Sequence, residues 1–398
     1  MKKETKLNVQ NVTLLFANFV VLAIFYCFAS AFFISKGYSN TSIGLILSIT
    51  NIGALFLSPV IADYADTSKK FSLTQILIIL TIVLIISIVP LYLIDHKSIV
   101  LSACFIIAMI ILNSTQPLYN TVGFKMEEFG VKSNYGFARA FGSMSYALTG
   151  AVVGNIIDAK GGNYMAVCGF TASLFLLLIL MWTNKTFKTC SSSTETKKED
   201  KEPVKLLDFI KNNTDIFFLC IAYSFILFSP NIIENFLLQI ITPLGGTAKD
   251  SGYLTFMWAM LELPTMFAFN WIKTKVKVEK LLIISGAAYL LKTFLMYIAT
   301  SMTLVYIALS LQWCSFALYC PAMVEYINNK VNKGEEVRGQ ALNATCNSIF
   351  MIFESAINGY LLDKLGPKPL LLVGVIATSF GFVLLNIVIR KIDNKSKA

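Results

Sequence analysis

The sequence predicts an all-α membrane protein with twelve transmembrane helices in two six-helix bundles. Of its 398 residues, 56% are hydrophobic and only 14% are charged, and the mean hydropathy is +0.67. Apolar stretches of about 20 residues, the length that crosses a bilayer, recur along the whole chain. They lack the alternation of polar and apolar residues that marks the strands of a membrane β-barrel.

The predicted spans follow these apolar stretches in chain order. They are 11–35, 41–62, 71–94, 98–120, 135–157, 163–183, 213–240, 250–272, 279–299, 302–327, 339–362 and 369–390. The first follows a lysine-bearing start but has no obvious small-residue cleavage site, so we expect it to be retained as a helix. We therefore expect an N-terminal bundle over 1–184, a cytoplasmic linker over 185–212, and a C-terminal bundle with a short cytoplasmic tail over 213–398. The Ser, Thr, Lys and Glu residues of the linker are typical of a flexible segment.

The two halves resemble each other in sequence. The fifth span ends in GNIIDAKG (154–161) and the eleventh in GYLLDKLG (359–366), with two glycines and an aspartate at identical spacing. Pro117 and Pro321 occupy matching places late in the fourth and tenth spans. Several markers in register indicate an internal 6+6 duplication.

Basic residues set the expected orientation. If both termini are cytoplasmic, the lysine-rich start, linker and tail all lie inside. The few basic residues left outside are Lys36, Lys97, Lys160, Lys249, Lys364 and Lys368. This agrees with the positive-inside rule, so we expect a multi-pass protein of the cell membrane with both termini in the cytoplasm. The net charge of +10 is then a property of the loops, and no nucleic-acid partner is expected.

Five ionisable residues lie inside the predicted spans. They are Arg139, Glu234, Glu262, Lys292 and Glu354. A charge at the bilayer centre costs roughly 2.5–3.5 kcal/mol on insertion scales, so such residues usually face a cavity or a partner and mark a transport pathway.

Twelve spans, a central loop and a 6+6 repeat resemble the major facilitator superfamily across nearly the whole chain. That resemblance implies two bundles that rock around a central site. The superfamily's loop motif after the second span is present only as PVIADYADTSKK (59–70), in which Asp63 and the lysines match but Pro59 and Asp66 replace glycines. The resemblance implies that Asp63 braces a neighbouring helix end as part of a cytoplasmic gate.

A second resemblance covers residues 117–148. Their layout is similar to lactose permease, the oligosaccharide:proton symporters and the nucleoside:proton symporters, in which an Arg-x-Phe-Gly pattern supplies a substrate-binding arginine. Here Arg139 matches that arginine, and Tyr146, two helical turns later, matches a stacking aromatic. A guanidinium fork suits vicinal hydroxyls and an aromatic ring suits the face of a sugar or base.

The chain departs from lactose permease at three places. An acid of the fourth helix is replaced by Asn120, and a His and an acid of the tenth helix are replaced by Gln312 and Ser315. The only histidine, His96, falls in an external loop. Proton coupling through a His–Glu pair is therefore excluded, and galactoside specificity is put in doubt.

Other polar residues lie in the second half. Asn231 and Glu234 are one turn apart in the seventh span, and Glu262 lies near the middle of the eighth. The eleventh span carries a polar stripe along one helical face: Asn343, Asn347, Glu354 and Asn358.

The charge count suggests how a cation is coupled. Three glutamates face one lysine and one arginine, so at least one carboxylate lacks a cationic partner and should be protonated much of the time, as a proton carrier must be. Our hypothesis is that Glu234 or Glu354 pairs with Lys292 and that Glu262 is the protonatable acid. A sodium ion held by asparagine oxygens and a carboxylate would use the same residues.

The expected substrate site is polar, amide-rich and aromatic. Its candidate residues are Tyr26, Asn120, Arg139, Tyr146, Asn231, Trp258 and Asn347. Such a site favours a neutral hydroxylated molecule, first a sugar or small oligosaccharide and next a nucleoside. A multidrug exporter of the same fold is the alternative. We expect a monomeric transporter rather than an enzyme, and no cofactor or metal, because the sequence has no phosphate-binding loop, catalytic triad or metal-ligand spacing.

Overall fold

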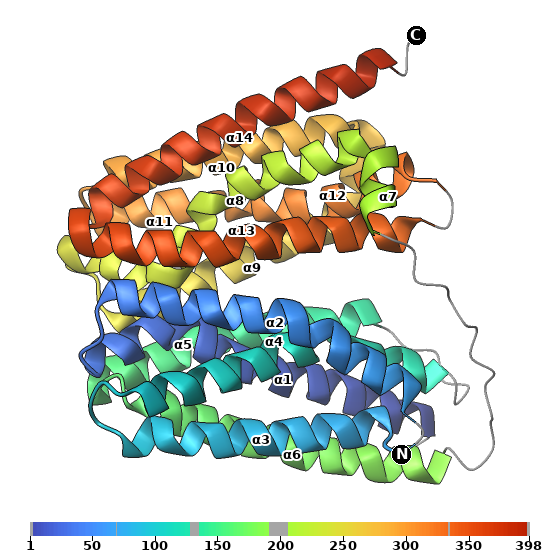
Figure 1. Cartoon of the computed structure of the whole chain (residues 1–398), viewed down its shortest axis with the longest axis vertical. Helices are drawn as coiled ribbons and strands as arrows, with labels where there is room; N and C mark the ends of the chain where they lie inside the picture. The colour runs from blue at the N-terminus through green and yellow to red at the C-terminus, as the bar shows by residue number, and fades with distance from the viewer. Residues whose placement is uncertain (1–2, 69, 128–134, 191–205, 333–334, 396–398) are drawn as a thin grey trace. The chain divides into compact units, whose positions relative to one another are not determined.

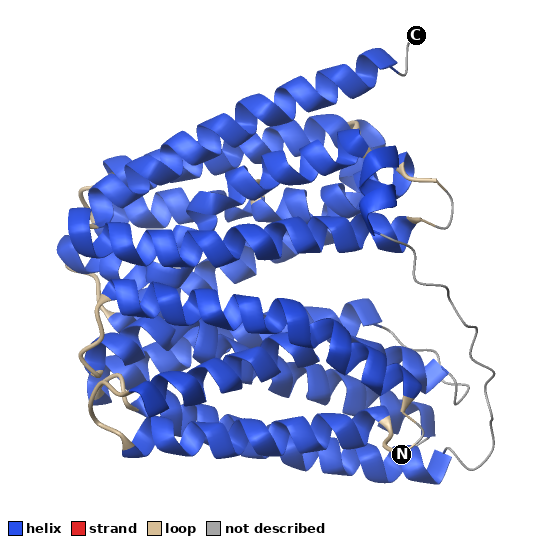
Figure 2. Ribbon diagram, in the orientation of Figure 1, coloured by secondary structure: helices blue, strands red, loops and turns tan. Residues whose placement is uncertain are grey.

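The computed structural model describes residues 3–68, 70–127, 135–190, 206–332 and 335–395. Within these ranges the regular elements are helices, and Figure 2 shows helices joined by loops without a strand. The predicted all-α fold is thus confirmed. The chain divides into two compact units, which we call unit 1 (Met1–Glu199 and Ala248–Phe256) and unit 2 (Asp200–Thr247 and Met257–Ala398). The bundle and linker boundaries expected from the sequence stay predictions, and residues 191–205 of the linker lie outside the described ranges.

Unit 1 contains the first six helices (Figure 1). They are α1 (Lys3–Ser35), α2 (Asn40–Thr67), α3 (Leu73–Leu93), α4 (Ile99–Glu127), α5 (Tyr135–Lys160) and α6 (Tyr164–Cys190). Serines begin two of them. Ser39 Oγ accepts the backbone N–H of Ser42 at α2, and Ser72 forms a reciprocal capping box with Gln75 at α3. These bonds satisfy amide groups that the first turn of a helix leaves without partners.

Unit 2 contains the remaining helices. They are α7 (Leu206–Asn212), α8 (Thr214–Ile241), the 3-10 helix η2 (Thr242–Leu244), most of α9 (Ala248–Lys275), α10 (Val278–Ile298), α11 (Met302–Ser310), η3 (Leu311–Trp313), α12 (Phe316–Lys330), α13 (Glu336–Leu365) and α14 (Pro367–Lys395). The start of α9 groups with unit 1, where Gly252 lies so close to α5 that a Cβ would meet the carbonyl oxygen of Gly150.

The two units use the same contact scheme. In unit 1, α1 packs against α5 and α6, and α3 packs against α4 and α6. In unit 2, α8 packs against α13 and α14, and α10 packs against α12 and α14. The repeated glycines of the sequence also have a matching role. Gly161 and Gly366 end α5 and α13 at φ of +94° and +83°, a backbone region that residues with a Cβ rarely adopt. The internal duplication is therefore visible in both packing and helix termination.

Ten helical stretches within the described residues are long and apolar enough to cross a membrane. The helices α9 and α13 are not among them. They are also the helices that carry Glu262 and Glu354, so their apolarity is reduced by the residues of greatest functional interest. The multi-pass membrane class is confirmed, whereas the count of twelve spans remains a prediction.

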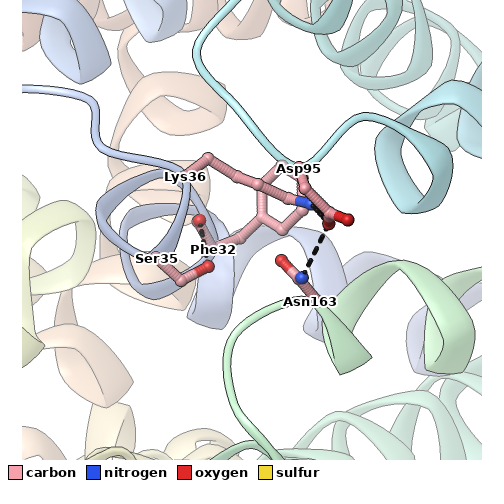
Figure 3. Close-up of polar contacts among 5 residues, drawn as sticks. All are labelled: Phe32, Ser35, Lys36, Asp95 and Asn163. Atoms are coloured by element: carbon pink, nitrogen blue, oxygen red, sulfur yellow. Dashed lines mark hydrogen bonds and ion pairs between the residues drawn. The ribbon is translucent and has the colours of Figure 1, made fainter.

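A polar cluster joins three connections at one end of unit 1 (Figure 3). Lys36, directly after α1, donates from Nζ to Asp95 Oδ1 at 2.9 Å, and Asn163 Nδ2 donates to the same oxygen at 3.1 Å. The Lys36 side chain is fully buried, whereas that of Asp95 is 78% exposed. The hydrogen bond from Lys36, followed by its charge, lowers the pKa of Asp95 below its ordinary value of 3.8. The carboxylate compensates a cation that is itself shielded from water.

Removing this carboxylate charge should destabilise the protein. In Asp95→Asn the buried Lys36 ammonium loses its anionic partner, so we expect a lower melting temperature in detergent at pH above about 5. Because the folded-state pKa of Asp95 is lowered, the wild-type advantage is fully present above the ordinary aspartate value and is lost as pH falls through the lowered value. Melting temperatures measured across acid pH should therefore converge.

The matched control is Asp158→Asn. Asp158 is an exposed carboxylate near the end of α5, and no ion pair of the described residues includes it. Equal melting temperatures for both variants and wild type at neutral pH would contradict a stabilising role for the Lys36–Asp95 pair.

Candidate functional site

The clearest polar arrangement of unit 2 is a three-residue chain that crosses three elements. Lys292 of α10 donates from Nζ to Gln312 Oε1 at 2.5 Å. Gln312, in η3, donates from Nε2 to Glu262 Oε1 of α9 at 2.7 Å. Lys292 is only 3% exposed, and its Nζ lies 5.9 Å from the centre of the Trp258 ring, one turn before Glu262. We call these three residues the amide-bridged chain.

Gln312 reaches this position because the helix around it is interrupted. The sequence predicts one span over 302–327, but the structure divides it into α11, η3 and α12. The backbone of the break keeps partners, since the carbonyl oxygen of Ser315 accepts from Ser285 Oγ at 2.9 Å and Cys314 Sγ donates to the carbonyl of Leu311. Both serines are fully buried. Irregular backbone at membrane depth is tolerated where protein surrounds it in this way.

A second polar arrangement joins α8 and α13. Asn231 Nδ2 donates to Glu354 Oε2 at 2.6 Å. Glu354 is 2% exposed, and its other oxygen has no hydrogen-bond partner among the described residues. Helix α8 contains Pro230 and departs from helical geometry at Phe236. Glu234 lies between these two irregular positions, and its side chain is exposed.

The polar stripe of α13 continues on both sides of Glu354. Asn347 accepts from Ser224 Oγ at 3.0 Å and donates weakly to the Tyr319 hydroxyl at 3.5 Å. One turn beyond Glu354, Asn358 is fully buried, and neither of its side-chain polar atoms has a partner within the described residues. Buried amides without partners are uncommon, and they occur where water, an ion or a ligand completes the bonding.

The predicted pairing of Lys292 differs from the arrangement observed. Among the described residues no ion pair joins Lys292 to a glutamate, and its contact passes through the neutral amide of Gln312 to Glu262. Glu234 lies near enough to interact with Lys292 electrostatically. Glu354 accepts a hydrogen bond from an asparagine, and no ion pair among the described residues includes it. Gln312 is a site residue that we did not select from the sequence, although it was matched there to the histidine of the tenth helix of lactose permease.

In unit 1, Arg139 is held between an aromatic ring and its own helix. Its guanidinium carbon lies 4.4 Å above the centre of the Phe19 ring of α1, and Nη1 donates to Ser143 Oγ at 2.7 Å. Gly142 makes room for that ring, because a Cβ there would come within 2.7 Å of Phe19. The Arg-x-Phe-Gly pattern therefore has a packing explanation for its glycine. Residues 128–134 of the resembling stretch lie outside the described ranges.

The other candidates of unit 1 lie on α1, α4 and α5. The Tyr26 hydroxyl donates to Asn113 Oδ1, and Cys27 Sγ donates to the Tyr146 hydroxyl at 3.4 Å. Asn120 has a buried carbonyl oxygen without a partner in the described part of the chain. A further α1–α4 bond, from Asn18 Nδ2 to Gln116 Oε1 at 2.6 Å, was not predicted. The sequence does contain a signal for these residues, because an amide side chain inside an apolar span is unusual. Three such amides lie in the first and fourth spans: Asn18, Asn113 and Gln116.

Asp63 of the expected gate lies in the last two turns of α2, with an exposed side chain. Its gating role stays a prediction. The described residues contain no group of three His, Cys, Asp or Glu side chains that could hold a metal ion.

Long apolar helices, two similar units and charges buried inside them define a multi-pass membrane transporter. The model of the MFS_1-like family matches residues 10–350, and the chain belongs to that family. This confirms the resemblance to the major facilitator superfamily. The family and the relatives below are transporters and not enzymes.

Relatives and solved structures agree with this class. The uncharacterized transporter YwbF of Bacillus subtilis (strain 168) is 23% identical over 372 residues, 90% of this chain and 87% of YwbF. A mutant of the nucleoside transporter NupG has a TM-score of 0.79 at 14% identity over 96% of this chain and 98% of its own. A bacterial homologue of the iron transporter ferroportin in an inward-facing state has a TM-score of 0.72 at 13% identity over 97% and 99%. Similarity at these identities shows the fold.

Proposed function

We propose that this transporter imports a small neutral hydroxylated solute, such as a sugar or small oligosaccharide, in symport with a proton. The observation that carries the proposal is the environment of Glu354. Glu354 is 2% exposed, and the hydrogen bond that its carboxyl group accepts comes from the neutral amide of Asn231. An ionised carboxylate buried without a cation is costly, whereas a protonated one is neutral and can donate a hydrogen bond.

The amide-bridged chain supports assigning the proton to Glu354. Lys292 and Glu262 carry opposite charges that Gln312 connects, so this chain is balanced when both ends are ionised. Glu354 has no such balance. We therefore propose Glu354 as the proton carrier, in place of the Glu262 hypothesis drawn from the sequence. Glu262 and Lys292 then hold a fixed charge pair, and Glu234 adds a carboxylate that solvent can reach.

The solute class is proposed from the chemistry of the remaining candidates. Unit 1 offers the Arg139 guanidinium, the hydroxyls of Tyr26 and Tyr146, and the Asn120 carbonyl, whereas unit 2 offers Trp258, Asn231 and Asn347. Amides and hydroxyls can fix the orientation of a polyhydroxylated molecule, and aromatic rings add contact area. Because most of these candidate ligands are neutral, they suit an uncharged solute better than an ionised one. A nucleoside satisfies the same groups, and NupG, named as a nucleoside transporter, has the same fold.

The remaining features of the proposal follow from topology. We place the protein in the cell membrane as a monomer, with both termini in the cytoplasm, a bundle at 1–184, a linker at 185–212 and a second bundle at 213–398. The lysine distribution supports the orientation. Transport proceeds by alternating access, and Asp63 contributes to the cytoplasmic gate.

Uptake into proteoliposomes tests this function. Purified protein should accumulate one or more radiolabelled sugars or nucleosides when an inward proton gradient is imposed, and a one-unit pH gradient should support up to about tenfold accumulation for one proton per solute. A sodium gradient alone should give none. Expulsion of cationic dyes, with no uptake of any sugar or nucleoside, would instead support the multidrug exporter.

Glu354→Gln separates binding from coupling. The neutral amide resembles the protonated acid, so exchange of internal for external solute should persist while gradient-driven accumulation falls to the level reached without a gradient. Glu262→Gln, by contrast, should impair exchange and accumulation together, because it removes one end of the amide-bridged chain. Both activities should be measured in the same vesicles. If Glu262→Gln instead lost accumulation while exchange stayed intact, Glu262 would be the proton carrier and the assignment to Glu354 would be wrong.

Gly142→Ala tests the binding role of Arg139. The added Cβ must displace the Phe19 ring that carries the guanidinium, so the KM for solute should rise. Gly169→Ala is the matched control, since its Cβ would come within 2.8 Å of the Phe25 ring away from Arg139. Overpacking costs about 1–3 kcal/mol at either glycine, so both variants should lose similar thermal stability. An equal change in KM for the two variants would argue against Arg139 as a solute ligand.

A further inference from the structure

Gln312 occupies an unusual position in the coupling region of unit 2. It lies in the 3-10 break of an interrupted helix, and its amide contacts the ends of two charged side chains from two other helices. The distances are 2.5 Å from Lys292 Nζ to Oε1 and 2.7 Å from Nε2 to Glu262 Oε1.

The orientation of the amide is compatible with a charge at each end. A lysine ammonium has only donors and a carboxylate only acceptors, so the carbonyl side of Gln312 must face Lys292 and the NH₂ side must face Glu262. This is the orientation observed. Both bonds are assisted by charge and are stronger than bonds between neutral groups. The bridge therefore favours an ionised Glu262.

Other titratable groups face this chain. Tyr289 of α10 interacts electrostatically with Glu262, and Glu234 of α8 and Cys314, just after η3, interact with Lys292. Lys292 is the one cation among these neighbours. If a further carboxylate were introduced beside Lys292, it would have to share the charge of this one lysine with Glu262 and Glu234.

We propose that Gln312 is a positioning residue that keeps Glu262 ionised throughout transport and so limits the coupling to one proton per solute. The inference rests on the proposed symport with a proton. A neutral amide can hold the carboxylate and the ammonium at once and has no proton to exchange near neutral pH. Glu354 is then the carboxyl group of this region that gains and loses a proton.

A carboxylate in place of the amide should change the stoichiometry. In Gln312→Glu, one oxygen can still accept from Lys292, but the other faces Glu262 and cannot donate unless a proton is bound. Two carboxylates that share one site do not both ionise, so the pair should take up an additional proton. Transport would then move two protons per solute if that proton is released on the other side.

The experiment measures the proton-to-solute flux ratio in proteoliposomes, with a trapped pH indicator and labelled solute. Wild type should give a ratio of one, and Gln312→Glu should give two, which would raise the limiting accumulation for a one-unit pH gradient from about tenfold to about one hundredfold. Gln340→Glu, a change at a glutamine near the start of α13 that donates to Asn328 of α12, is the control and should keep a ratio of one.

Two further variants keep the test decisive. The exchange Glu262→Gln/Gln312→Glu moves the charge along the chain but keeps its number, so it should restore a ratio of one. If Gln312→Glu does not fold, Gln312→Asn replaces it, because the shorter amide cannot reach both partners, and its ratio should exceed one.

The outcomes separate the two proposals. A wild-type ratio of zero would overturn the symport with a proton itself. A wild-type ratio of one with an unchanged ratio in Gln312→Glu, or in Gln312→Asn where that variant is used, would overturn the role of Gln312 alone. The role of Gln312 would also be overturned if the proton-to-solute ratio of the double variant Glu262→Gln/Gln312→Glu did not return to one.

Discussion

The organisation of the second unit depends on one constraint, that a charge inside a membrane protein must find compensation within the protein. Lys292 is almost completely buried and cannot be hydrated. Its contact with Gln312, and through it with Glu262, supplies the compensation. This requirement brings α9, α10 and η3 together, and it explains why α9 can be less apolar than its neighbours and still belong to a transmembrane bundle.

The interrupted helix follows from the same constraint. A regular helix over 302–330 would satisfy its own backbone but would present Gln312 at a different height and angle. The break costs backbone hydrogen bonds, and Ser285 replaces part of that loss by donating to the carbonyl of Ser315. Discontinuous helices of this kind place polar groups at membrane depth in other transporter folds. The geometry of the site and the irregularity of the backbone are therefore linked.

The fold was predictable because long apolar stretches and repeated glycines are local features of a sequence. Gly161 and Gly366 illustrate this, since the need for a positive φ at a helix end is decided by one residue. The site was less predictable. Lys292 was assigned a carboxylate partner, but its contact is an amide whose position depends on a helix break with neither proline nor glycine inside it. The bond from Asn231 to Glu354 depends on the rotation of α8 and α13, which spacing along a single helix does not determine.

An amide bridge also suits a protein that must change conformation. Direct contact between a buried ammonium and a buried carboxylate is strongly attractive where the dielectric constant is low, and separating the pair leaves two uncompensated charges. With Gln312 between them, the charges stay farther apart while each keeps a charge-assisted hydrogen bond, and each bond can re-form separately. Glu354 lacks this compensation and can be neutralised by a proton alone. In the proposed mechanism, Glu262 is balanced by a distant cation and Glu354 by a proton, and this difference allows one unit to hold both a permanent charge pair and a titratable group.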